Sequence, residues 1–369
     1  MRFKKNVNRF SLGVEIELQL IDKKTMDLRP CSQQILKNLK QKTKQVKSEL
    51  FQSMIEINSR PHTQLVDLQS DLQEQVYLLQ QSCQKMDVAL SGTGTHPFAR
   101  YNERIVTPEP RYKDLIIKKQ LIARRLLIFG VHIHIGCTSK SETIELNNFF
   151  IHYLPLMQAM TASSPFWQGK VTGLLSSRPT IFEALPTGGH PEIFKNWKHF
   201  EETIHFMTKT KSIHSHKDLW WDLRPSPEYG TLELRACDGL NTIQEVMGLC
   251  YLIQGLCHLF QHQKKPMLPA MLPSNWIMRE NKWRACRDGI AADLITPNYK
   301  LVSFKKSFDK LITSINKSNQ KWRNDKFHKN LINMRKSTSA LRQLRVFKET
   351  EDLSKVVSFN CLEFERSYR

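Results

Sequence analysis

Two glutamates that could bind a cation lie two positions apart near the start of the chain. Glu15 and Glu17 interrupt an otherwise mostly apolar run at residues 11–21. In an extended strand successive side chains face opposite sides, so the aliphatic residues would share one face and both carboxylates the other. Carboxylates about 7 Å apart on one face repel each other unless a cation or a basic side chain neutralises them. The pair therefore indicates either a solvated edge-strand face or one wall of a cation site.

A second acidic stretch could supply partners for this pair. Residues 48–57 have the composition of a strand, and Glu56 lies between Ile55 and Ile57. In one regular strand Glu49 and Glu56 would face opposite sides. Both could serve one site only if the strand has a bulge or begins after Glu49. An exposed strand position is the alternative for Glu56.

Two later segments carry groups suited to a metal ion or a phosphate. Residues 130–136 alternate, so His132 and His134 share a face, and imidazoles at that spacing can both reach one ion or one phosphate. Residues 220–225 and 231–238 predict a hairpin in which Glu233 and Arg235 share a face. The alternatives are histidines satisfied by neighbouring polar groups and a salt-bridged surface pair.

These groups fit one chemistry, which is phosphoryl transfer. Carboxylate oxygens are the ligands that Mg²⁺ and Mn²⁺ prefer, and more than one ion would be needed to offset so many acids. Arg235 and Arg178, the latter in an irregular stretch rich in Gly, Ser and Pro, could hold the transferred phosphoryl group. The chain has no Walker or Rossmann glycine pattern, so we expect ATP to bind on an antiparallel sheet. A zinc-dependent hydrolase that uses His132 and His134 is an alternative from another class.

Helices must hold these strands in place. Apolar residues spaced three or four apart predict a long core helix at 62–90. Further helices are expected at 32–40, 112–127, 141–162, 191–207, 241–263 and 276–295, and basic amphipathic helices at 300–369. The sequence thus predicts an α+β protein whose residues 1–369 form a single catalytic domain, with the motif-bearing part at 11–289.

Composition narrows the class of protein. The chain has 369 residues, a net charge of +20 and a pI near 9.6. Its lysines are scattered, which makes nucleic-acid binding an unfavoured explanation and fits steering of an anionic small-molecule substrate such as a nucleotide. Eight dispersed cysteines without a CxxC pair, and an apolar run at 115–135 interrupted by charges, predict a soluble cytoplasmic protein that does not span a membrane. The sequence is compatible with a homo-oligomer.

Several segments together resemble a known family. They are GVEIELQLID, the pair Glu49 and Glu56, GTHPF with a later Arg111-Tyr112, GVHIHIG, SSPFWQGKVTGLLSSR and GTLELRACD. In content and order they are similar to the type 2 glutamate–cysteine ligases, also called carboxylate–amine ligases. The resemblance implies a glutamine synthetase-like catalytic fold, a curved antiparallel β-sheet with helices packed behind it. It also implies that ATP converts the γ-carboxylate of glutamate into an acyl phosphate, from which an amine displaces phosphate.

Carried over motif by motif, the resemblance implies separate cation and phosphate sites. The metal ligands would be Glu17, Glu49 and Glu56 for one Mg²⁺ or Mn²⁺ ion and Glu15, His132 and Glu233 for another. His134 and Arg235 would face the ATP phosphates, and Arg178 the acyl phosphate or the γ-phosphate. The expected activity is that of a glutamate–cysteine ligase of glutathione biosynthesis. The same chemistry on a different amine or carboxylate is the alternative.

Overall fold

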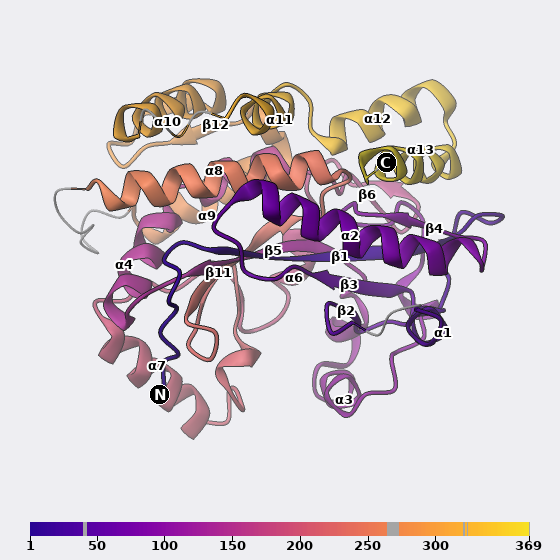
Figure 1. Cartoon of the computed structure of the whole chain (residues 1–369), viewed down its shortest axis with the longest axis horizontal. Coiled ribbons are helices and arrows are strands. Elements are labelled where there is room, and N and C mark those ends of the chain that lie inside the picture. Colours follow the sequence, from indigo (N-terminus) through magenta and orange to yellow (C-terminus); the bar gives the residue numbers. More distant parts are fainter. Residues whose placement is uncertain (40–42, 264–272, 320–321, 323, 369) are drawn as a thin grey trace.

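The computed structural model describes residues 1–39, 43–263, 273–319, 322 and 324–368, and its centre is a seven-stranded antiparallel sheet (Figure 1). The strand order is β10-β11-β5-β1-β3-β2, and β4 also pairs with β1. The strands are β1 (Leu12–Asp22), β2 (Val46–Ser48), β3 (Met54–Asn58), β4 (Val88–Ser91), β5 (Gly130–Gly136), β10 (Leu223–Ser226) and β11 (Thr231–Asp238). The predicted α+β class, with an antiparallel sheet, is confirmed.

The sheet has an apolar face and a polar face because its central strands alternate. In β1, Val14, Ile16 and Leu18 are buried in the main core, whereas Glu15 and Glu17 face the other side. The neighbouring strands repeat this pattern with Val131, Ile133 and Ile135 in β5 and Leu232, Leu234 and Ala236 in β11. Since β1 is a central strand, its two glutamates are not the solvated face of a sheet edge.

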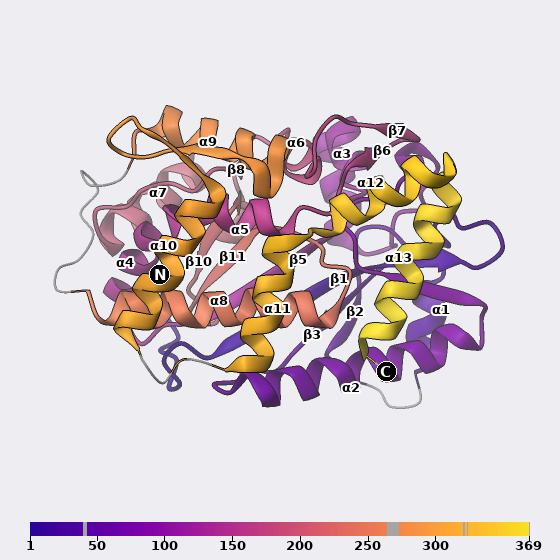
Figure 2. The same ribbon diagram turned by 90° about the horizontal axis from the view of Figure 1, so that it is seen from above.

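Helices cover the apolar face in two layers. In Figure 1, α2 (Leu65–Gln84) and α8 (Ile243–Gln261) lie next to the sheet, and the C-terminal helices lie above them. Figure 2 shows the C-terminal helices spread over this side of the molecule. They are α10 (Phe304–Ser318), α11 (Asp325–Lys336), α12 (Ser339–Thr350) and α13 (Leu353–Tyr368). The predicted helical part at 300–369 is thus confirmed, except that it begins with a short strand.

The remaining elements lie at the flanks and ends of the sheet. The helices are α1 (Ser32–Lys37), α3 (Pro110–Arg124), α4 (Lys140–Ile151), α5 (Leu154–Thr161), α6 (Arg178–Phe182), α7 (Trp197–Lys209) and α9 (Asn275–Asp288). The short strand pairs are β6 (Phe166–Trp167) with β7 (Lys170–Val171), β8 (Gly188–Gly189) with β9 (Trp220–Trp221), and β12 (Asp293–Ile295) with β13 (Leu301–Ser303). In Figure 1, α3 and α7 lie on the side of the sheet opposite α8, which leaves the polar face between them.

The structure corrects several predicted boundaries. The segment 48–57 is not one strand, because β2 ends at Ser48 and β3 begins at Met54. The helix predicted at 62–90 ends at Gln84, and a turn with Asp87 at φ +53° leads into β4. The helix predicted at 141–162 is split, since α4 ends at Ile151 and α5 begins at Leu154, with Pro155 in its first turn, where the missing N–H of proline is tolerated. The helix predicted at 276–295 ends before Gly289, whose φ of +55° breaks the helical path.

The long apolar helix α8 and the cysteines are buried in the structure. Within the described ranges, α8 is the helix long and apolar enough to cross a membrane by length and composition. Most of α8 is buried, and it packs against α2, α10 and α11, as a core helix does. All eight cysteines are buried free thiols.

Candidate active site

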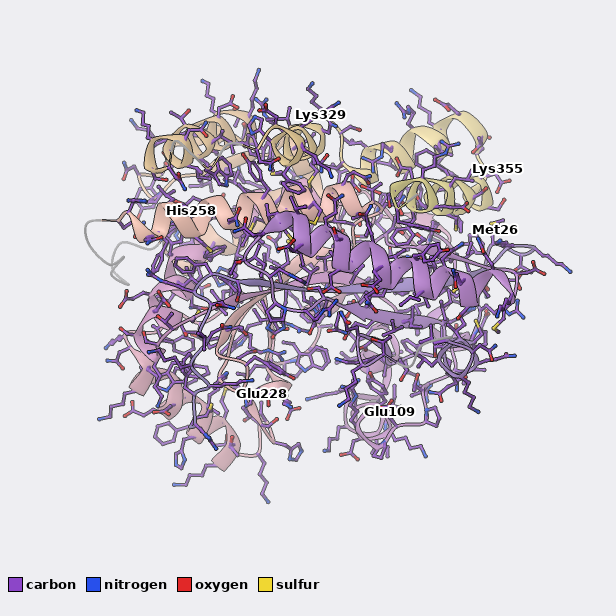
Figure 3. All side chains as sticks on the ribbon, viewed as in Figure 1. Met26, Glu109, Glu228, His258, Lys329 and Lys355 are labelled. Atoms are coloured by element: carbon purple, nitrogen blue, oxygen red, sulfur yellow. The ribbon has the colours of Figure 1, made fainter. Side chains whose placement is uncertain are left out.

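The polar face of the sheet lines a cavity of about 280 Å³. In Figure 3, Glu228 and Glu109 are labelled on the side of the sheet opposite α8, and Glu228 lines the cavity. Eight of the predicted site residues line it: Glu15, Glu17, Glu49, Glu56, His132, His134, Glu233 and Arg235. The ninth, Arg178, lines a smaller cavity of about 60 Å³ that shares Glu17, His132 and Arg235 with the first. The structure therefore brings all the predicted residues to one place.

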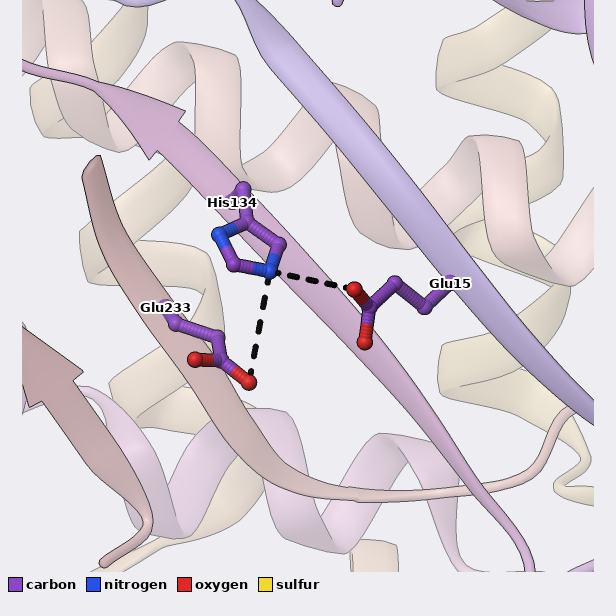
Figure 4. A group of neighbouring side chains, drawn as sticks. All are labelled: Glu15, His134 and Glu233. Carbon is purple, nitrogen blue, oxygen red and sulfur yellow. Dashed lines mark ion pairs between the residues drawn. The ribbon is translucent and has the colours of Figure 1, made fainter. Parts of the chain in front are cut away.

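The first group in the cavity consists of Glu15, His134 and Glu233 (Figure 4). Each offers one ligand atom, and these atoms lie within 4.8 Å of one another. His134 Nε2 is 3.4 Å from Glu15 Oε1 and 4.0 Å from Glu233 Oε1. His134 Nδ1 is 2.9 Å from Thr231 Oγ1, a contact that fixes the ring and leaves Nε2 facing the two carboxylates.

Electrostatics hold both acids of this group ionised. Burial alone would raise the pKa of Glu15, but hydrogen bonds to His132 and His134 outweigh it and keep that pKa well below its ordinary value. The pKa of Glu233 is also lowered, because Arg235, Arg224 and His134 outweigh its burial. Burial acts to lower the pKa of His134, yet Glu233 and Glu15 prevail and raise it. A positive charge is therefore favoured between the two carboxylates.

His132 lies in a different environment from His134. It is the cross-strand partner of Glu15, and its Nδ1 is 3.3 Å from Glu15 Oε2. Burial, reinforced by Arg235, lowers its pKa to about 4, so the ring is neutral at pH 7. Its Nε2 is 3.5 Å from Arg178 Nη2, a donor, and so acts as the acceptor. The register pairs Glu233 with His134, which places His134 and not His132 beside Glu233.

The second group consists of Glu17, Glu49 and Glu56. Glu17 and Glu56 are paired across β1 and β3, and Glu49 reaches them from the turn after β2. Burial raises the pKa of Glu17 to about 7, with Arg178 opposing and Glu56 reinforcing the shift. Burial and the other two carboxylates raise the pKa of Glu49 well above its ordinary value, and that of Glu56 is raised as well, first by burial. Three crowded acids of this kind are typical of a cation site.

Two buried arginines lie beside both groups. Arg235 is 8% exposed and Arg178 is 2% exposed. Arg235 pairs with Glu233, and Arg178 Nη1 donates to the carbonyl of Arg235 at 3.3 Å. In the described part of the chain, the Nε atoms of both arginines are buried and have no hydrogen-bond partner. Both arginines also line the cavities, and a guanidinium at such a position suits an anionic ligand such as a phosphate or a carboxylate.

Local structure explains how Arg178 and Arg235 reach this position. Arg178 is the first residue of α6, and its backbone N–H donates to Ser164 Oγ at 3.0 Å. Arg235 lies within an irregularity in β11, where the pairing with β5 shifts between Leu234 and Cys237. A bulge of this kind redirects side chains and is common next to active sites.

Four residues of the site were missed by sequence reasoning. Arg224 Nη2 is 2.8 Å from Glu233 Oε2, and the two residues are paired across the β10–β11 hairpin. The register of the predicted hairpin could have revealed Arg224. Tyr112 donates to Glu49 at 3.2 Å, and Lys47 Nζ is 3.8 Å from Glu56 Oε1. The Gly130 N–H donates to Glu17 at 2.5 Å. Nothing in the spacing of these last three indicated the site.

The two acidic groups fit divalent cations by their donor chemistry. Glu17, Glu49 and Glu56 supply carboxylate oxygens only, and Glu15, His134 and Glu233 supply two carboxylates and an imidazole. In the group of Glu17, Glu49 and Glu56, a bound cation would relieve the mutual repulsion that contributes to the raised pKa values. The chain's residues are therefore suited to holding Mg²⁺ or Mn²⁺ next to a polyphosphate.

Comparison with known proteins shows that the chain is similar to glutamate–cysteine ligases. Residues 11–325 match the family described as glutamate-cysteine ligase family 2. A protein of Bdellovibrio bacteriovorus named "putative glutamate–cysteine ligase 2" is 38% identical over 359 residues, which are 97% of this chain and 95% of that protein. A protein of the same name from Gloeobacter violaceus is 39% identical over 290 residues, 78% of each chain.

The fold is similar to that of solved ligases. The glutamate–cysteine ligase of Francisella tularensis, solved in complex with AMP, superposes with a TM-score of 0.73 at 11% identity and covers 99% of this chain and 89% of its own. The bifunctional glutathione synthetase of Pasteurella multocida gives a TM-score of 0.69 at 12% identity, covering 98% of this chain and 53% of its own. At such identities the likeness shows the fold alone.

Proposed function

The chain belongs to glutamate–cysteine ligase family 2, and on that premise we propose that it is an ATP- and Mg²⁺-dependent ligase that joins the γ-carboxylate of glutamate to the amine of cysteine. The observation that carries the proposal is the placement of two buried arginines with unpartnered N–H groups beside two acidic groups on one sheet face. This arrangement suits a reaction in which a phosphoryl group is transferred to a carboxylate.

The reaction that we propose has two steps. An oxygen of the γ-carboxylate attacks the γ-phosphorus of ATP, the bond to the bridging oxygen breaks, and ADP leaves. The amine then attacks the acyl carbon, and inorganic phosphate leaves as the amide forms. Bound Mg²⁺ would neutralise the polyphosphate charge and polarise its oxygens.

The chain's own residues have separate tasks in this reaction. Arg235 and Arg178 hold the phosphoryl group and stabilise the charge that develops on its oxygens. Glu15, His134 and Glu233 form one cation site, and Glu17, Glu49 and Glu56 form the other. Neutral His132 links Glu15 to Arg178 and keeps both in position. Assignment of each acid to a particular ion rests on the cross-strand register.

The same site supports a second candidate, in which another amine or carboxylate is joined by the same chemistry. Family membership establishes the ligase type and leaves the pocket for the second substrate undefined. The zinc-hydrolase alternative gains no support, because the relatives and structures named above are ligases.

We further propose that residues 1–369 act as one catalytic domain in the cytoplasm. The main core joins residues from β1 to α13, so the C-terminal helices are part of the unit that carries the site. The eight buried free thiols fit a reducing compartment.

Phosphate release from the purified protein tests the proposal. With ATP and Mg²⁺ present, release should require glutamate and cysteine together. Each amino acid should be omitted in turn, and a panel of other carboxylates and amines should replace it. Release with another amine but never with cysteine would refute the named substrate and keep the ligase chemistry. Absence of ATP-dependent release with every pair would refute the ligase proposal.

A further inference from the structure

A second cavity of about 480 Å³ adjoins the active site, and residues 4–7 near the start of the chain form part of its wall. The two cavities share Glu15, Lys47, His134 and Tyr229. Its volume is within the range of about 300–1,000 Å³ that small-molecule sites have. Two members of the first acidic group, Glu15 and His134, are therefore part of both cavities.

The wall of the second cavity is basic. It is lined by Lys4, Lys5 and Lys47, whereas Glu15 is its one acidic residue among those described. A cavity with this charge next to a cation site attracts an anion. Lys4 and Lys5 are exposed residues that line the cavity, so their ammonium groups are accessible to an anion.

The segment 3–10, which we call the N-terminal strap, is fixed to the sheet by its backbone. The Lys4 N–H donates to the Pro227 carbonyl at 2.8 Å, and the Asn6 N–H donates to the Cys137 carbonyl at 3.1 Å. The Phe10 N–H donates to the Gly136 carbonyl at 2.8 Å. These bonds hold the strap across the ends of β5 and the β10–β11 turn.

A ring contact and close packing against two glycines also hold the strap in place. The rings of Phe3 and Trp197 meet edge to face at 5.3 Å. Gly230 has φ +64°, and a Cβ there would collide with the carbonyl of Lys4. At Gly136 a Cβ would lie 2.6 Å from Ser11 Oγ and 2.8 Å from the Asn8 carbonyl. The strap can therefore pack against the β10–β11 turn and the end of β5 only because glycine occupies positions 230 and 136.

We propose that Lys4 and Lys5 of the N-terminal strap bind the phosphates of the nucleotide nearest its ribose, and that the second cavity holds the nucleoside. This inference rests on the proposed function, since it assigns the two ends of the same site. Arg178 and Arg235 line the smaller cavity and not the second one, and so would face the γ-phosphate and the carboxylate substrate. Glu15 and His134, common to both cavities, lie between the ends where a polyphosphate would pass.

Binding of ADP in the presence of Mg²⁺ tests the inference without turnover. The double variant K4Q/K5Q should raise the Kd for ADP roughly fivefold to twentyfold, because two charge-assisted contacts to phosphate are lost from a partly solvated site. K4E/K5E should raise it further. The matched control is K23Q/K24Q, which removes two exposed lysines in the turn that follows the last residue of β1 and should leave the Kd unchanged.

The outcomes separate the two proposals. A wild-type protein that binds ADP, with K4Q/K5Q binding it equally well, would overturn the role of the strap and leave the ligase proposal standing. A wild-type protein that does not bind ADP at all would overturn the ligase proposal, and the inference with it. The KM for ATP should rise in K4Q/K5Q while kcat stays near that of the wild type, a split that general damage to the fold would not give.

Discussion

Glu17 on β1 and Glu56 on β3 are paired directly across the sheet, on the face that lines the cavity. Like charges at directly opposite positions destabilise a sheet. The pKa of Glu17 is raised to about 7 by burial, which Arg178 opposes and Glu56 reinforces. A stable fold tolerates this pair when one carboxyl is protonated or when a cation lies between them.

The first prediction is that Mg²⁺ binding depends on pH through this pair. A metal ion must displace the proton that the raised pKa of Glu17 retains, so apparent affinity should increase from about pH 6 to about pH 8. At pH 7 binding should release protons. Calorimetry in two buffers with different ionisation enthalpies measures this release directly. Binding heats that do not depend on the buffer would contradict the predicted proton release. The control is Glu74→Gln, at an exposed position outside the cavity, which should bind Mg²⁺ as the wild type does.

The second prediction concerns Arg235. Arg235→Gln should lower kcat by about 10²- to 10³-fold, since a preorganised donor to the transferred phosphoryl group is lost. Glu233 keeps its 2.8 Å ion pair with Arg224, so the fold should persist. Phosphate release and thermal melting are measured side by side. Arg100→Gln, whose side chain is 70% exposed, should behave as the wild type, and an Arg235→Gln enzyme of normal rate would remove Arg235 from the catalytic residues.

A third prediction follows from the position of Gly130. A Cβ at this position would overlap the guanidinium of Arg178 and lie 3.1 Å from His132 Nε2. Gly130→Ala should therefore displace Arg178 and lower kcat by about tenfold or more. In an Arg178→Ala background the same substitution should cost little more, because the group that it displaces is gone. Full additivity of the two effects in kinetic measurements would show that Gly130 acts in another way.

The fourth prediction is structural and concerns Lys282. Its Nζ lies 2.5 Å from Asp222 Oδ2 and 2.5 Å from Glu183 Oε1, and the Asp222 carbonyl accepts the backbone N–H of Arg235 at 2.8 Å. Lys282→Met leaves the buried Asp222 carboxylate without its close cation, so the free energy of unfolding should fall by about 3 kcal/mol. Urea denaturation measures the loss. Adding Asp222→Asn should restore part of it, and a double variant less stable than Lys282→Met would contradict the pairing.

Sequence alone was sufficient for the strands whose side chains alternate. The apolar residues around Glu15 and His132 set the face of each strand, and the observed core uses those faces. The sequence was insufficient to predict contacts between side chains of different strands, because these contacts depend on which strands pair and in which register. The proximity of Glu233 to His134 is a consequence of the register between β5 and β11, which no local pattern contains.

Turns and long-range contacts account for the other differences. The segment 48–57 divides into two strands because residues between β2 and β3 turn back, and this turn lets Glu49 join Glu17 and Glu56. Tyr112 and Lys47 enter the site from separate elements, and their spacing in the sequence does not indicate a contact with Glu49 or Glu56. Such contacts depend on the assembled sheet.

Transfer of ¹⁸O from substrate to phosphate tests the central proposal most directly. Glutamate labelled with ¹⁸O in its γ-carboxylate is incubated with the enzyme, ATP, Mg²⁺ and cysteine, and the released phosphate is examined by mass spectrometry. If the carboxylate attacks the γ-phosphorus and the amine then displaces phosphate, each phosphate should carry one ¹⁸O from the substrate. Phosphate released without the label, during formation of the dipeptide, would contradict the acyl-phosphate route.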